Sequence, residues 1–134
     1  MADRRQILKA GLIGSVLPLG ALASAARAAE PLKIHRAVFD RRFAAGRAFA
    51  AEARARGWTT VAIEGDVTEV WYHHLAQRWR EGPAPIAGVT DANSLFVLER
   101  LAWDAGLRVT SRAPLPNEPV ISWLIAPQAR ALAA

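Results

Sequence analysis

Two patterns of apolar and polar residues alternate along residues 33–125 of the chain. Short apolar or alternating runs have the length of β-strands, and stretches with apolar residues three and four positions apart have the period of helices. The predicted strands cover residues 33–38, 59–64, 85–89, 107–112 and 120–125, and the predicted helices cover residues 41–56, 66–82 and 91–105. This order predicts an α/β domain, a small three-layer sandwich around a mainly parallel sheet of four to five strands. The last strand follows a proline-rich loop and can instead return antiparallel at an edge of the sheet.

An aspartate stands at the start of each predicted helix, at Asp40, Asp66 and Asp91, and Thr90 is an alternative cap for the third helix. Asp is favoured there because its carboxylate accepts hydrogen bonds from the free backbone N–H groups of the first turn. Arg41 and Arg42 then fall in the first turn of a predicted helix, where the helix dipole disfavours cations. These two arginines are either a solvated surface or a patch that faces a partner.

The first 28 residues have the layout of a targeting segment. The charged sequence Asp-Arg-Arg-Gln-Ile-Leu-Lys at residues 3–9 is followed by an apolar stretch over residues 10–22. That stretch is interrupted by glycines and a proline, and it is shorter than the ~20 apolar residues that a membrane-spanning helix needs. The tripeptide Ala-Arg-Ala at residues 26–28 then has the small-x-small form of a signal-peptide cleavage site.

Residues 4–9 (Arg-Arg-Gln-Ile-Leu-Lys) resemble the twin-arginine (Tat) export motif, which has a Ser or Thr, two arginines, any residue, Phe, Leu and Lys. Here Asp3 stands in place of the hydroxyl residue and Ile7 in place of Phe. The resemblance implies a cleavable signal peptide over residues 1–28, recognised by the Tat translocase through Arg4 and Arg5. The mature domain, residues 29–134, would then lie in the periplasm after a transient contact with the membrane. A general secretory signal peptide and an uncleaved anchor are the alternatives.

The charge and the residue types exclude several classes of protein. The net charge is +5, but residues 29–134 carry 13 Lys and Arg against 11 Asp and Glu, so a nucleic-acid partner is not expected. The absence of cysteine excludes disulfides, thiolate zinc sites, iron–sulfur clusters and covalent haem. His73 and His74 are neighbours in a predicted helix, and neighbouring helical residues do not share a face. We therefore expect neither a metal nor a cofactor.

Polar residues follow the first three predicted strands, at the ends where a parallel sheet binds its ligands. They could hold a cation or supply a base, and a helix start after the third strand could accept an anion. The alternative is that the aspartates among them only cap helices. The candidates for a ligand site are Asp40, Glu64, Asp66, Thr90 and Asp91.

The third predicted helix has apolar residues almost all round. Phe96 and Trp103 lie seven residues apart, nearly opposite the stripe that contains Leu95 and Leu98. Either another part of the chain covers these two aromatic residues, or they form a partner interface or a homo-oligomer interface, because aromatic residues are enriched at binding hot spots.

The resemblance to Tat signals implies a folded passenger that carries a cofactor or travels with a partner that does. Because no cofactor motif is found, the sequence favours an exported periplasmic accessory or binding protein that acts with a partner such as an exported oxidoreductase. Catalysis is the less favoured role. The alternative is a small ligand-binding domain or enzyme that uses the acidic residues at the strand ends.

Overall fold

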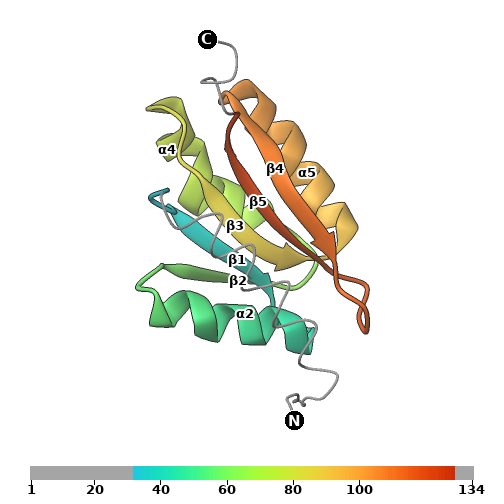
Figure 1. The fold of residues 1–134 in the computed structure, drawn as a ribbon. Helices are drawn as coiled ribbons and strands as arrows, with labels where there is room; N and C mark the ends of the chain where they lie inside the picture. Colours follow the sequence, from blue (N-terminus) through green and yellow to red (C-terminus); the bar gives the residue numbers. More distant parts are fainter. Residues whose placement is uncertain (1–31, 129–134) are drawn as a thin grey trace.

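The computed structural model describes residues 32–128, in which strands and helices alternate until the last two strands, which follow one another directly (Figure 1). The strands are β1 (Arg36–Asp40), β2 (Thr60–Ile63), β3 (Ile86–Thr90), β4 (Leu107–Pro114) and β5 (Ile121–Pro127). The helices are α2 (Ala44–Ala55), the consecutive segments α3 (Thr68–Val70), η2 (Trp71–Leu75) and α4 (Ala76–Arg80), and α5 (Ala92–Asp104). The predicted signal peptide lies outside the described residues. No helix within residues 32–128 has the length and apolar character needed to span a bilayer.

The five strands form one sheet in the order β2-β1-β3-β5-β4. β1 pairs in parallel with β2 and β3, and β5 pairs antiparallel with β3 and β4. Four strands therefore run in one direction and β5 runs in the other. The predicted α/β class and the antiparallel direction of the last strand are confirmed. However, β5 is an inner strand of the sheet, and β4 is the outermost strand beside it.

Side chains on β3 and β5 explain why the last strand lies beside β3. Gly88 is opposite Trp123 in the register, and a Cβ atom at Gly88 would lie 2.4 Å from the indole Cζ2 atom. The glycine therefore gives the indole the room it needs. The indole Nε1 donates a hydrogen bond to the Thr90 hydroxyl at 3.0 Å, and both side chains are fully buried. Trp123 thus attaches β5 to the centre of the sheet.

Helices cover both faces of the sheet and give the three layers of the prediction (Figure 1). On one face α2 packs with a core that includes Phe39, Phe49 and Leu124. On the other face α5 and the α3–η2–α4 segment pack with a core that includes Trp79, Leu98 and Trp123. The polar side chains described below lie at the ends of the strands, outside these two cores.

The helix starts differ from the prediction at two of the three aspartates. Asp91 caps α5 as expected, because its carboxylate accepts from the backbone N–H of Ser94 at 2.9 Å. Asp40 does not cap α2. The carboxylate of Glu118, from the turn between β4 and β5, accepts instead from the backbone N–H groups of Ala44 at 2.9 Å and Ala45 at 2.8 Å.

The second predicted helix begins at Thr68, with Val67 rather than Asp66 at its N-cap, and its middle is π-helical. Asp66 accepts from the backbone N–H of Thr68 at 2.8 Å and from its hydroxyl at 2.7 Å, so it organises the turn before the helix. The carboxylate of Glu69, in the first turn of this helix, lies 2.9 Å from His73 Nε2, one turn further along.

Candidate functional site

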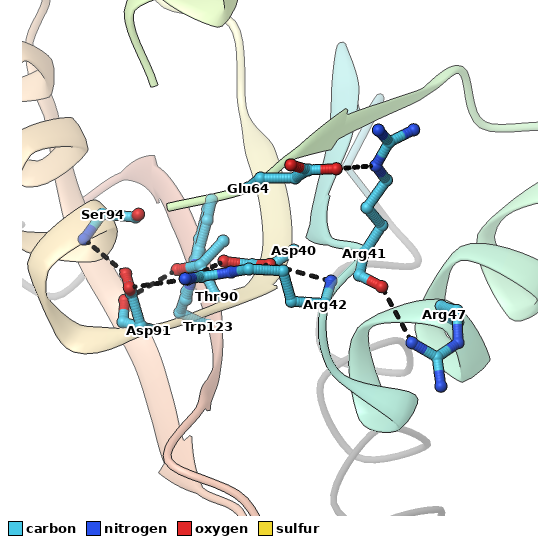
Figure 2. A network of polar contacts seen from close by, with 9 residues as sticks. All are labelled: Asp40, Arg41, Arg42, Arg47, Glu64, Thr90, Asp91, Ser94 and Trp123. Atoms are coloured by element: carbon cyan, nitrogen blue, oxygen red, sulfur yellow. Dashed lines mark hydrogen bonds and ion pairs between the residues drawn. The ribbon is translucent and has the colours of Figure 1, made fainter. Parts of the chain in front are cut away.

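The carboxyl ends of β1, β2 and β3 meet at one edge of the sheet, which we call the acidic edge (Figure 2). Asp40 ends β1, Glu64 follows β2, and Thr90 and Asp91 lie at the end of β3. β1 lies between β2 and β3, and the helices that follow β1 and β3 lie on opposite faces. Ligands of α/β proteins commonly bind at such a switch point.

Asp40 is the buried centre of the acidic edge. Its side chain is fully buried, and its two carboxylate oxygens accept from Arg42 Nε at 2.9 Å and Arg42 Nη2 at 2.7 Å. The backbone N–H of Arg42 also donates to it, at 3.0 Å. Burial raises the pKa of Asp40, but hydrogen bonds from Arg42 and Gly65, together with the Arg42 charge, outweigh burial and lower the pKa below its ordinary value. Asp40 is therefore ionised at neutral pH.

Arg42 connects the two strands at the switch point. Its Nη2 lies 3.2 Å from Asp91 as well as 2.7 Å from Asp40, and its side chain is nearly half exposed. The hydrogen bonds and charges of these two aspartates raise the pKa of Arg42. Gly65 leaves room for the Arg42 guanidinium, because a Cβ atom at residue 65 would lie 2.9 Å from Arg42 Nη2. Gly65 also has a φ of +83°, which favours glycine.

The other predicted acidic residues have partners of their own. Glu64 forms an ion pair with Arg41, and both side chains are more than half exposed. Asp66 bonds only to Thr68 among the described residues and has no contact with the other candidates. The structure thus brings Asp40, Thr90 and Asp91 together and leaves Asp66 apart.

Ion pairing limits the chemistry of the acidic edge. Asp40 and Asp91 share the charge of Arg42, and Glu64 faces Arg41, so each of these carboxylates already has a cation. An ionised Asp with a lowered pKa is also poorly matched to general acid–base catalysis near neutral pH. No group of three or more potential metal ligands occurs among residues 32–128.

Residues from two distant parts of the sequence meet at the opposite edge of the sheet, where the parallel strands begin. His35 Nε2 lies 2.7 Å from the backbone carbonyl of His74, in η2, although the two histidines are 39 residues apart. Arg36 Nε donates to His74 Nδ1 at 3.0 Å. Sequence reasoning missed this cluster because no local pattern joins the start of β1 to η2.

The outer face of α5 exposes both of the predicted interface residues. Phe96 is 60% exposed and Trp103 is 42% exposed. Two arginines lie over the Trp103 ring, Arg100 at 4.4 Å and Arg108 at 5.4 Å from its centre. The described part of the chain therefore leaves Phe96 and much of Trp103 uncovered.

Comparison with known proteins assigns no family to the chain. Its sequence matches no protein-family model. No curated protein and no solved structure matches it.

Proposed function

We propose that this protein is an exported periplasmic accessory protein that holds no cofactor of its own and acts by binding a second exported protein. The observation that carries the proposal is the exposed outer face of α5. We call this surface the α5 ridge and define it as Phe96, Val97, Arg100 and Trp103.

The fold does not need the α5 ridge for its own core. The opposite face of α5 is filled by Leu95, Leu98 and Ala102, which are at most 1% exposed. Phe96 and Val97 are 60% and 43% exposed, so most of their apolar surface remains in water. Clustered exposed aromatic residues are typical of binding sites, and aromatic and arginine side chains dominate binding energy.

The charges beside the ridge indicate the chemistry of the partner. Arg100 and Arg108 lie over the Trp103 ring, and neither forms an ion pair with another described residue. Arg112 is paired with Glu99 at 3.4 Å, so the unpaired positive charge remains on the Trp103 side. A partner surface with an apolar centre and carboxylates at its rim would complement these groups.

The ion pairs of the acidic edge favour this proposal over the alternative of an acidic ligand site. A ligand that needs a free carboxylate would first have to displace Arg42 or Arg41. The α5 ridge needs no such rearrangement before it can bind.

Replacing both ridge aromatics tests the proposal. Phe96→Ala with Trp103→Ala should abolish co-purification with the exported partner. Tyr72→Ala should retain it, because Tyr72 is 70% exposed but belongs to η2. The double variant should also lose less unfolding free energy than Leu98→Ala, for which about 2–5 kcal/mol is expected at a fully buried position. Unchanged association, association only with a second copy of this chain, or a stability loss as large as that of Leu98→Ala would contradict the proposal.

Export has its own test. Replacing Arg4 and Arg5 together with Lys should leave the precursor in the cytoplasm, because the Tat motif is read through its two arginines. Export that continues in this variant and stops in a Sec-deficient strain would refute the Tat assignment.

A further inference from the structure

A basic pocket of about 520 Å³ lies where β1 and β3 begin, at the edge of the sheet opposite the acidic edge. It is lined by residues before and at the start of β1, the loop between α2 and β2, α4, and the loop before β3. Its ionisable lining residues are Lys33, His35, Arg36 and Arg78, and none of the lining residues is acidic. We call it the amino-edge pocket. Its volume falls within the range of about 300–1,000 Å³ that is usual for small-molecule sites.

The hydrogen bonds around Arg36 hold its guanidinium in place. Nε donates to His74 Nδ1 at 3.0 Å, and Nη1 donates to the His35 backbone carbonyl at 2.7 Å. Nη1 also lies 3.4 Å from His35 Nδ1. Nη2 has no hydrogen bond among the described residues, which leaves donors for a further group. A guanidinium that is fixed before a ligand arrives loses little freedom on binding.

Both histidines are neutral in this arrangement. His35 Nε2 donates to the His74 carbonyl, and His35 Nδ1 faces the Arg36 Nη1 donor at 3.4 Å, so Nδ1 is the acceptor. His74 Nδ1 accepts from Arg36 Nε, so neither Nδ1 carries a proton. Burial lowers the pKa of His35, and the nearby charges of Arg36 and Arg78 lower it further, although the bond to the His74 carbonyl opposes them. Burial and then Arg36 also lower the pKa of His74. The positive charge of the pocket therefore belongs to Lys33, Arg36 and Arg78.

These three cations have no carboxylate partner among the described residues. Lys33 is exposed, whereas Arg36 and Arg78 are half-buried. Arg78 donates only to the Gly82 carbonyl, at 3.3 Å. Partly buried arginines are usually paired with an anion, because removing a cation from water costs free energy that a counter-charge offsets. The missing counter-charge points to a bound anion.

We propose that the amino-edge pocket binds a small, doubly charged oxyanion, best matched by the phosphate group of a soluble phosphate monoester. The free Nη2 of Arg36 and the guanidinium of Arg78 can donate to phosphate oxygens, and Lys33, which also lines the pocket, adds a third charge. This inference does not depend on the α5 ridge or on its partner.

A simpler role for one of these cations is to complement the helix dipole, because Arg78 lies in the last turn of α4. Arg80 lies in the same turn and does not line the pocket, so it provides a matched control. A dipole effect would involve both arginines, whereas an anion site would involve only Arg78.

The test is calorimetric titration of the full chain with inorganic phosphate at low ionic strength, with NaCl at equal ionic strength as the reference. We expect saturable binding of one phosphate per chain. Arg36→Gln and Arg78→Gln should each weaken it about tenfold or more, as expected for the loss of a charge-assisted hydrogen bond. Lys33→Gln should also weaken binding, and Arg80→Gln should leave it within about threefold of wild type, as for a screened surface charge. Because Lys33 is exposed, its variant tests the charge without disturbing the core.

Nuclear magnetic resonance of the imidazole groups provides the second readout. Phosphate should raise the titration midpoints of His35 and His74, because an anion favours the protonated rings. No saturable binding, or equal weakening by Arg78→Gln and Arg80→Gln, would overturn the proposal. Binding to phosphatidic acid vesicles that inorganic phosphate does not compete away would overturn the assignment to a soluble anion.

Discussion

Asp40→Asn tests how far one buried ion pair stabilises the acidic edge. The substitution keeps the shape of the side chain but removes its charge. It also places an amide N–H group opposite Arg42 Nη2, which donates to the present carboxylate at 2.7 Å. Because Asp40 is fully buried, water cannot replace the lost bond on its side.

The size of the effect follows from the burial of the two partners. Removing one member of a fully buried ion pair costs about 3–5 kcal/mol. Arg42 is 45% exposed, so its guanidinium regains part of its hydration and remains beside Asp91. We therefore expect Asp40→Asn to lower the free energy of unfolding at pH 7 by about 2–3 kcal/mol, near the cost of losing a charged hydrogen bond.

The pH dependence has a definite sign. The pKa of Asp40 is lowered in the folded state, so the folded state binds a proton less readily than the unfolded chain. The stabilisation is complete above the unfolded pKa of about 3.9 and is lost as the pH falls from there through the folded pKa. The deficit of Asp40→Asn relative to wild type should therefore shrink at acidic pH.

Urea unfolding followed by tryptophan fluorescence measures both effects in the full chain, which has five Trp residues. Asp66→Asn is the control. Asp66 is exposed and Asn caps a turn about as well as Asp, so we expect no resolvable change in the free energy of unfolding. If Asp40→Asn also changes stability by less than about 0.5 kcal/mol at pH 7, the assigned role of the buried pair is wrong. A deficit that persists below the folded pKa would refute the electrostatic explanation.

Two further predictions concern the packing of α2 and the histidine cluster. Gly46→Ala should lower unfolding free energy by about 2 kcal/mol or more, because the new Cβ atom would lie 2.2 Å from the Asp40 carbonyl oxygen; urea unfolding within about 0.5 kcal/mol of wild type would contradict this close approach. Stability should also decrease as the pH falls below about 6.5, since burial and the Arg36 charge keep His35 and His74 neutral in the folded state while the unfolded chain takes up protons. The double variant His35→Gln with His74→Gln should flatten this pH dependence between about pH 5 and 7, the range in which His titrates. An unchanged slope would exclude the histidine cluster as the source of the pH dependence.

Most of the fold could be predicted from local patterns, because each strand and helix carries its own period. The ends of elements were less predictable where distant residues form the caps. Glu118 caps α2 from a turn more than 70 residues later in the chain, and no pattern near Ala44 indicates it. The position of β5 could not be predicted either, since it depends on the contact between Gly88 and Trp123 across the sheet.

The acidic edge was predictable because parallel strands bring their carboxyl ends together, whatever side chains they carry. Its ion pairs were not. The predicted helix included Arg42, whereas α2 starts at Ala44, and the extra turn lets Arg42 fold back onto Asp40. The amino-edge pocket had no local signal, because Lys33 and Arg78 are brought together only by the folded sheet and its helices.

The most direct test of the central proposal is site-specific photo-crosslinking in the periplasm, with benzoylphenylalanine in place of Phe96. Ala48 is the matched control, because it is exposed on α2, which packs on the opposite face of the sheet. We predict a crosslink from position 96 to one exported protein, no such crosslink from position 48, and loss of the crosslink when Arg100→Glu is added. The same products from both positions, or crosslinks only to a second copy of this chain, would contradict the account.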